Sequence, residues 1–236
     1  MFNSPKEIAQ NYIATGVAKT KLPVSKMLIL GILAGMFIAL ASAGQTFASA
    51  SLTGSMSRYI SAFIFPVGLA MVLIAGSELF TGNNLIVISV LEKEAKLTGM
   101  LKNWFFVYIG NFIGSIIIAL LVVYSDSGSF FGNEVGGTII NTAAYKTSLS
   151  FQDALLRGIL CNILVCIAVW MSFAAKDIAG KFLALFMPIW LFVMLAFEHS
   201  IANMYYIPAG LFASRNPAYL AAADLTGNFR TLTWGT

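Results

Sequence analysis

Three ionisable side chains lie inside long stretches of the sequence that carry no other charge: Glu78, Glu198 and His199. Placing an ionisable group away from water is costly, so we treat all three as candidate functional residues. His199 is the only histidine, which excludes a metal site built from several histidines. An imidazole exchanges protons near neutral pH, and His199 is therefore the strongest of the three candidates.

Both glutamates are followed by an asparagine at the same distance. Asn83 stands five positions after Glu78, Asn203 stands five positions after Glu198, and the two pairs are 120 residues apart. A broken helix frees backbone N–H and C=O groups, which a nearby polar side chain can satisfy. We therefore predict that both Glu/Asn pairs are structural residues at helix breaks. Thr81, within the first pair, could offer its hydroxyl to a permeant species or cap a helix.

The composition indicates which elements must position these residues. Of the 236 residues, 58% are hydrophobic and 10% are charged, and the mean hydropathy is +0.83. A soluble domain is typically about 45–50% apolar and about 25% charged. A body of this size could not hide the excess apolar surface from water, which excludes a soluble enzyme, a secreted disulfide scaffold and a disordered tail. The sequence predicts an all-α polytopic membrane protein.

Five intervals are long and apolar enough to cross a bilayer, which takes about 20 helical residues. They cover residues 27–57, 59–91, 103–125, 158–175 and 182–214. The second and the fifth are each 33 residues long. As straight helices they would measure about 50 Å, whereas the hydrocarbon core is about 30 Å thick, so each is predicted to break.

The two predicted breaks carry the polar residues described above. They fall in SELFTGNN (77–84) and in FEHSIANM (197–204). Matched breaks of this kind are typical of transporters built from an internal repeat, whose discontinuous helices meet near the membrane midplane. Irregular backbone at that depth is tolerated only where it is buried in protein or lines a cavity.

The domain organisation follows from these intervals. We treat residues 1–236 as one transmembrane channel domain, with a first repeat over 26–125 and a second over 154–236. Residues 4–19 are predicted to form an amphipathic surface helix with Ser4 as its N-cap. With the N-terminus in the cytoplasm, nine basic residues lie inside and five outside, which favours that orientation.

Other features point away from an enzyme. Cys161 and Cys166 lie in one apolar run and are typical of packing residues, and the sequence carries no cofactor fingerprint. We therefore expect no enzyme activity, no cofactor and no metal. Lys146 lies in the long outer loop, where a lone lysine is typically solvated. The tripeptide Asn216-Pro217-Ala218 matches the NPA of aquaporins, but it stands alone and outside the last apolar run, so we attribute it to chance.

Four segments resemble the formate/nitrite transporter family, which includes bacterial formate, nitrite and hydrosulfide channels. They are GSELFTGNNL (76–85), KNWFFVYIGNFIGS (102–115), CNILVCIAVWMS (161–172) and FEHSIANMYYIP (197–208). The resemblance implies an aquaporin-like inverted repeat with two broken helices and six spans, assembled as a homopentamer in the bacterial inner membrane. Five spans are visible, and we expect a final span to follow the given sequence.

The resemblance also assigns roles to individual residues. His199 resembles the pore histidine, and Thr81 the threonine that faces it. Lys146 resembles the lysine that draws anions into the outer vestibule, and Asn162 an asparagine near the histidine. Phe65 and Phe192 resemble the residues of the family's outer constriction. The residues that resemble its inner constriction are Leu69, Leu79, Phe80 and Val165.

These expectations combine into one mechanism. The chain would conduct small monovalent anions of weak acids, namely formate, nitrite or hydrosulfide, and the TGNN wording favours hydrosulfide. Lys146 would attract the anion, and Thr81 and His199 would hydrogen-bond it and share a proton with it. The neutral acid then crosses the apolar constrictions at a lower desolvation cost than the anion. The alternative is an aquaporin-like channel for neutral solutes, with no pH dependence at the histidine.

Overall fold

The computed structural model describes residues 2–52 and 54–225, and this part of the chain is helical without strands. Its helices are α1 (Pro5–Thr20), α2 (Val24–Ala50), α3 (Gly54–Ile64), α4 (Pro66–Ala75), α5 (Phe80–Asn83), α6 (Ile86–Leu91), α7 (Leu97–Tyr124), α8 (Glu134–Ser148), α9 (Phe151–Ser172), α10 (Ile178–Met194), α11 (Ser200–Ala213) and α12 (Pro217–Ala222). A short turn of 3₁₀ helix, η1 (Ser127–Ser129), precedes α8. The end of the predicted second repeat, including Arg230, lies outside the described residues.

The helices follow the predicted spans. Within the described residues, α2, the continuous pair α3–α4, α7 and α9 are long and apolar enough to cross a membrane on their own. The fifth predicted interval is divided between α10 and α11. The prediction of an all-helical membrane fold is thereby confirmed.

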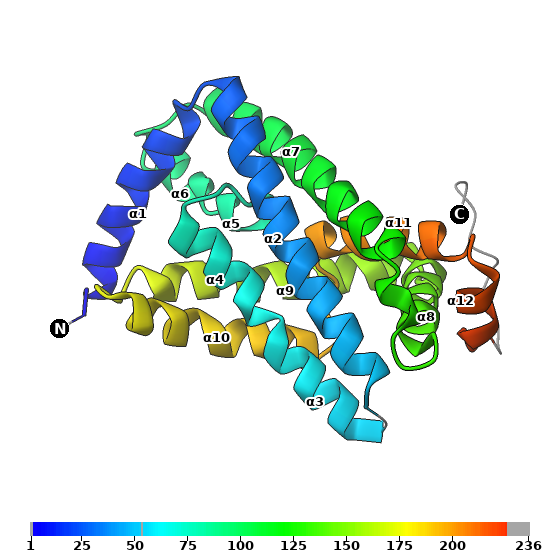
Figure 1. Ribbon diagram of the computed structural model, residues 1–236. Coiled ribbons are helices and arrows are strands. Elements are labelled where there is room, and N and C mark those ends of the chain that lie inside the picture. The colour runs from blue at the N-terminus through cyan, green and yellow to red at the C-terminus, as the bar shows by residue number, and fades with distance from the viewer. Residues whose placement is uncertain (1, 53, 226–236) are drawn as a thin grey trace.

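Both 33-residue intervals are broken. The first leaves the helical conformation at residues 76–79 and the second at residues 195–199. Gly76 ends α4 with a φ of +75°, a left-handed conformation that glycine adopts without steric cost. Ala196 takes a φ of +53° at the second break. The chain reverses locally at both places, and the polar segments that follow are directed into the middle of the molecule (Figure 1).

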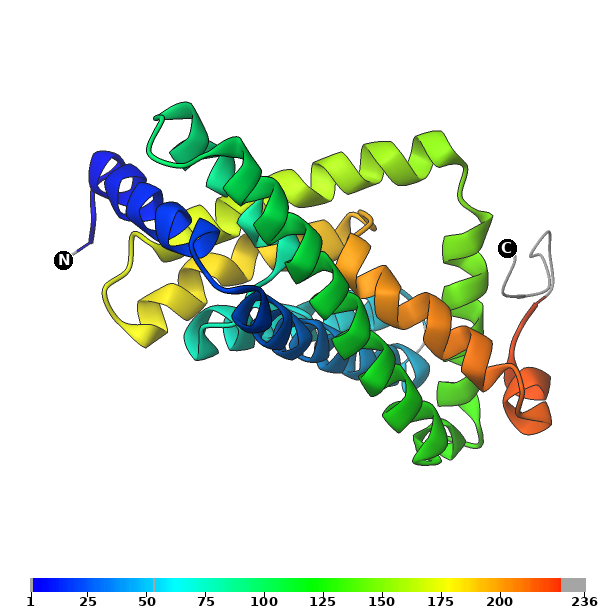
Figure 2. The same ribbon diagram turned by 90° about the horizontal axis from the view of Figure 1, so that it is seen from above.

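Helices α2 and α7 form the most extensive helix–helix contact among the described residues. The two helices lie side by side in both ribbon views (Figures 1 and 2). A Cβ atom added to Gly110 would lie 2.7 Å from the carbonyl oxygen of Leu28 and 3.0 Å from the Cα of Gly31. One added to Gly114 would overlap the carbonyl oxygen of Ile32. Glycine is thus required for this approach, as small-residue pairs in membrane helices predict.

The N-terminal helix α1 is packed on the molecule. Ser4 and Glu7 form a capping box, with the Glu7 N–H donating to the Ser4 hydroxyl at 3.4 Å. Ile8, Tyr12 and Gly16, spaced four residues apart, form its buried face. This face contacts α6, and a Cβ at Gly16 would overlap the Ser89 hydroxyl. The helix therefore covers α6, which comes after the first break in the chain.

Helix α8 lies within the segment that the sequence analysis treated as a long outer loop. Its buried residues Val135, Ile139, Ile140, Ala143 and Ala144 recur at helical spacing and pack against α11. Helices α1 and α8 lie at opposite ends of the molecule (Figure 1). Each precedes the first span of its repeat and carries a lysine near its C-terminal end, so α8 is the counterpart of α1.

Candidate pore site

The first break is held by a buried ion pair and a network of amides. The Glu78 carboxylate accepts from the Lys19 ammonium at 2.6 Å and from the Asn83 amide at 2.7 Å. Lys19 also donates to the Asn83 side-chain oxygen at 3.0 Å. The Asn83 amide donates to the Asn103 side-chain oxygen at 2.9 Å, and the Trp104 indole donates to the Asn83 carbonyl at 3.0 Å. Every polar atom of Glu78 and Asn83 in this network therefore has a partner.

A second amide fixes the backbone of this break. Asn111, fully buried on α7, accepts the N–H of Phe80 at 3.0 Å. Its side-chain N–H groups donate to the carbonyls of Gly31 at 2.8 Å and Glu78 at 2.9 Å. One side chain thus satisfies the backbone on both sides of the non-helical segment and joins it to α2.

The second break repeats the ion pair. The Lys146 ammonium donates to the Glu198 carboxylate at 2.7 Å, and the Asn203 amide donates to the same carboxylate oxygen at 2.9 Å. Lys146 also lies over the ring of Tyr206, 5.1 Å from its centroid. The two Glu/Asn pairs predicted from the sequence therefore lie at the two breaks, each with a lysine from the preceding short helix.

The side chains of His199 and Thr81 connect the two breaks directly. The ring Nδ1 of His199 accepts the N–H of Ala202 at 3.1 Å, which caps α11. A nitrogen that accepts a hydrogen bond carries no proton, so the proton of the neutral ring is on Nε2. This N–H donates to the Thr81 hydroxyl oxygen at 3.0 Å. The Thr81 hydroxyl proton is then free to donate to another group.

Apolar side chains lie directly beside this polar pair. The rings of Phe65 and Phe192 meet edge to face, with centroids 5.5 Å apart, and the His199 ring stacks on Phe192 at 5.8 Å. Leu69 and Leu79 are also buried. Polar hydrogen-bonding groups are therefore placed next to rings and side chains from which water is excluded.

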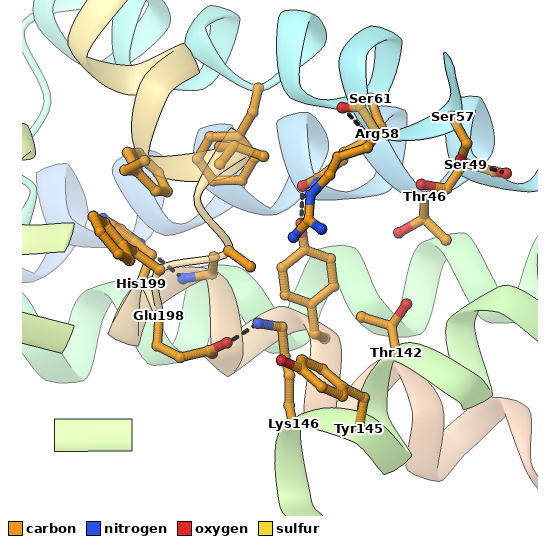
Figure 3. A pocket seen from close by; sticks show the side chains of 18 of the residues that line it. Thr46, Ser49, Ser57, Arg58, Ser61, Thr142, Tyr145, Lys146, Glu198 and His199 are labelled. Atoms are coloured by element: carbon orange, nitrogen blue, oxygen red, sulfur yellow. Dashed lines mark hydrogen bonds and ion pairs between the residues drawn. The ribbon is translucent and has the colours of Figure 1, made fainter. Parts of the chain in front are cut away.

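Two cavities approach this centre from opposite sides. The outer one, of about 330 Å³, is bounded by Phe65, Phe192 and His199 and contains Lys146 (Figure 3). The inner one, of about 430 Å³, is bounded by Leu69 and Leu79 and contains the Lys19–Glu78 pair. The predicted outer constriction and two of the predicted inner residues thus border different cavities.

Asn162 and Phe80 border a third, lateral cavity. It has a volume of about 690 Å³, lies beside α9, and is also lined by Thr81 and His199. The Asn162 amide is 3.7 Å from the Cys166 sulfur, and its side-chain oxygen has no partner among the described residues. The Phe80 ring packs on Tyr108 at 5.0 Å. Val165 is buried in the apolar core, so its place in a constriction stays a prediction.

Sequence reasoning missed four residues of this arrangement: Lys19, Arg58, Asn103 and Asn111. Asn103 and Asn111 are polar residues two helical turns apart in an otherwise apolar span, which is a usable signal. Lys19 could have been found by extending the repeat backward to a short helix before each first span. Arg58 was interpreted as the end of a span, whereas its side chain lines the outer cavity. Asn216 caps α12 by accepting the Ala218 N–H, away from the pore site.

Comparisons with known proteins agree with this geometry. Residues 6–236 match the family model described as Formate/nitrite transporter. The chain is 40% identical to an uncharacterized transporter of Bacillus subtilis (strain 168), YrhG, over 90% of this chain and 81% of that protein. It is 33% identical to the formate channel FocA of Escherichia coli (strain K12), over 97% of this chain and 82% of that protein.

A solved structure shares the fold. A pentameric formate channel with formate bound matches with a TM-score of 0.79 and 30% identity, over 90% of this chain and 86% of that chain. These relatives are channels and transporters, which confirms the prediction that the chain is not an enzyme. The family model and these relatives show that the chain belongs to the formate/nitrite transporter family.

Proposed function

We propose that this chain is a channel for formate and other small monovalent anions of weak acids. The observation that carries the proposal is the Thr81–His199 contact at 3.0 Å, which lies beside buried apolar rings and borders the outer cavity through His199. The Escherichia coli relative FocA and the solved pentameric channel are both formate channels, which supports formate as the first substrate to test. The preference for hydrosulfide drawn from the TGNN segment stays a prediction that the same experiment addresses.

The mechanism depends on the difference between a charged and a neutral permeant. An anion in the outer cavity keeps water and polar side chains as neighbours, whereas the rings of Phe65 and Phe192 offer neither. Crossing these rings as an ion is costly, because burial of an unpaired charge carries a large desolvation penalty. We propose that the anion takes a proton from a hydronium ion in the outer cavity, which leaves a water molecule behind, and passes as the neutral acid.

Thr81 and His199 act on the permeant through hydrogen bonds. With the His199 proton on Nε2 and donated to Thr81, the Thr81 hydroxyl donates its own proton to an oxygen of the permeant. Both side chains stay neutral in this arrangement, and α11 keeps its cap. The pair thus stabilises the permeant next to the rings at the point where it shares a proton with water.

Flux measurements in proteoliposomes test this proposal. We expect formate uptake to rise as the external pH falls toward the range in which more neutral acid forms, and nitrite and hydrosulfide provide the substrate comparison. His199→Phe removes the Nε2 donor and the cap, and we expect flux to drop and its pH profile to change. Equal flux and an equal pH profile in His199→Phe would remove His199 from the mechanism.

A matched control replaces another ring N–H by phenylalanine at a place where that N–H makes no hydrogen bond. The Trp190 indole N–H has no partner among the described residues, so Trp190→Phe removes a ring N–H without removing a hydrogen bond. We expect this variant to conduct like the unaltered chain. The size-exclusion profile of both variants reports whether assembly is intact.

The aquaporin-like alternative is tested on the same vesicles. A channel for neutral solutes would raise water or glycerol permeability and show no pH dependence at His199. We expect neither permeability to exceed that of empty vesicles, because the apolar rings separate the two cavities.

We also propose a homopentamer in the bacterial inner membrane with a cytoplasmic N-terminus. The pentameric state of the solved formate channel and the bacterial relatives support the first part. The lysine-rich end that carries α1 supports the orientation. Native mass spectrometry should give five protomers, and a fluorescent protein fused to the N-terminus should fold and fluoresce in the cytoplasm.

A further inference from the structure

The outer cavity has fewer available positive charges than its residues suggest. Lys146 was expected to attract anions, yet its ammonium is 2.7 Å from the Glu198 carboxylate. Both side chains are largely buried, with 13% and 6% of their surface exposed. The field of such a pair falls off as that of a dipole and adds little net attraction at the mouth of the cavity.

A second cation lines the same cavity. Arg58 extends from α3 into the cavity, on the side that also holds Lys146 (Figure 3). Its guanidinium makes no ion pair and no side-chain hydrogen bond within residues 2–52 and 54–225. The hydroxyl groups of Ser57, Thr46 and Thr142 line the same wall. Among the residues that line the cavity, two cations and one carboxylate thus leave one net positive charge, and the cation without a partner carboxylate is Arg58.

We propose that Arg58 is the residue that collects anions at the outer mouth, and that Lys146 instead holds Glu198 at the second break. This inference rests on the proposed function for its biological meaning, because an anion channel is what such a charge would serve. An unpaired guanidinium in a concave site raises the local concentration of anions without binding one tightly. Arginine suits this position because it stays charged at every physiological pH and can contact a carboxylate through two parallel N–H groups.

The charge of the cavity can be measured without any transport. Thr142→Cys places a thiol on the cavity wall, and its reaction rates with an anionic and a cationic methanethiosulfonate reagent report the local potential. We expect the ratio of anionic to cationic rates to fall about threefold or more in Arg58→Gln on this background. Arg58→Lys should keep the ratio, and Arg58→Glu should lower it further.

Arg215 provides a charge-matched control. It is an exposed arginine just beyond the end of α11, and it does not line the outer cavity. Arg215→Gln removes the same charge and should leave the ratio unchanged. The chain without Thr142→Cys measures the background from Cys161 and Cys166. An equal ratio in Arg58→Gln and Arg215→Gln would overturn the inference.

Formate uptake by intact cells connects the charge with transport. In Arg58→Gln we expect the formate concentration for half-maximal uptake to rise about three- to tenfold at low ionic strength, with the maximal rate unchanged. This difference should shrink as an impermeant salt is added, because salt screens the charge. A reduced maximal rate with an unchanged half-maximal concentration would also overturn the inference.

The two proposals fail in different ways. If cells with the unaltered chain take up no formate beyond the vector control, the proposed function fails while the reagent ratio still decides the role of Arg58. If formate uptake is present and the reagent ratio does not depend on Arg58, the inference fails and the channel stands.

Discussion

The two broken helices each rest on the span that begins their own half of the chain. The N–H of Glu78 donates to the Leu30 carbonyl of α2 at 3.1 Å, and the N–H of Glu198 donates to the Arg157 carbonyl of α9 at 3.3 Å. Each glutamate then pairs with a lysine from the short helix before that span. The repeat therefore extends to individual hydrogen bonds.

The two breaks differ in what holds their backbone. Asn111 binds both sides of the first break from α7. At residues 195–200 no side chain from another helix binds the backbone, within the part of the chain that the structure describes. The side-chain oxygen of Asn203 is also unpartnered there, whereas the matching oxygen of Asn83 accepts from Lys19. Within the described residues, the first break is thus held by an amide from another helix and its Asn83 side chain is fully paired, whereas the second break has no such amide and keeps a buried, unpartnered oxygen on Asn203.

Replacing Asn111 should have the largest effect on this comparison. Asn111→Leu keeps the side-chain size but leaves the Phe80 N–H and the Glu78 carbonyl without a partner. We expect a loss of about 2–5 kcal/mol in the free energy of unfolding, since each buried unpaired group costs about 1–3 kcal/mol. Thermal unfolding of the purified protein in detergent measures this.

The control for Asn111→Leu is another amide in a helix. The side-chain oxygen of Asn141 has no partner among the described residues, so Asn141→Leu should change the melting temperature little. Equal shifts for both variants would show that Asn111 does not hold the break.

The next largest effect should be a difference in stability between the variants of the two glutamates. Glu78→Gln leaves Lys19 unpaired and puts an amide N–H against the donors that surround it, so we expect a loss of about 2–4 kcal/mol. Glu198→Gln should cost about half as much, because two side chains donate to Glu198, whereas three donate to Glu78. Removing Lys19 as well, in Lys19→Met with Glu78→Gln, should recover part of the loss. A larger loss for Glu198→Gln would show that the second break, and not the first, depends more on its glutamate.

The contact between the breaks should affect flux more than stability. Thr81→Val keeps the shape of the side chain and removes the hydroxyl that accepts from His199. Because one hydrogen bond is worth about 1 kcal/mol, we expect formate flux to fall about tenfold or less with a small change in melting temperature. Thr81→Ser keeps the hydroxyl and should retain most of the flux, whereas equal losses in both variants would point to packing.

The smallest effect should come from the start of α1. Hydrogen bonds from the Ser4 backbone N–H and hydroxyl hold the pKa of Glu7 below its usual value. The stabilisation is present above the unfolded pKa of about 4.3 and is lost as pH falls through the lower folded pKa. The protection of the first-turn amides against hydrogen exchange, taken relative to the intrinsic rate at each pH, should therefore fall below pH 4. In Ser4→Ala we expect low protection at neutral pH too, with the Lys19–Glu78 pair unaffected.

Much of the scaffold could be predicted from the sequence because chain length and charge spacing are global constraints. Two 33-residue intervals cannot stay straight in a bilayer, and the repeated Glu/Asn spacing marked where they bend. Helix α8 was missed because its buried residues gain their apolar surroundings from α11, which is distant in sequence. The role of Arg58 was missed for the same reason: its spacing marks the edge of a span, and only the fold places Lys146 and Glu198 together across the cavity.

The attachment of Lys19 to the first break has a consequence for biosynthesis. The ribosome delivers α1 before α4, so the cation is made 59 positions ahead of the acid that it neutralises. Lys19 can wait in water at the membrane surface, whereas Glu78 enters a nonpolar medium together with its helix. The acid gains its lysine partner only when α1 packs on the first break. The ion pair therefore joins the start of the chain to a segment that is synthesised much later.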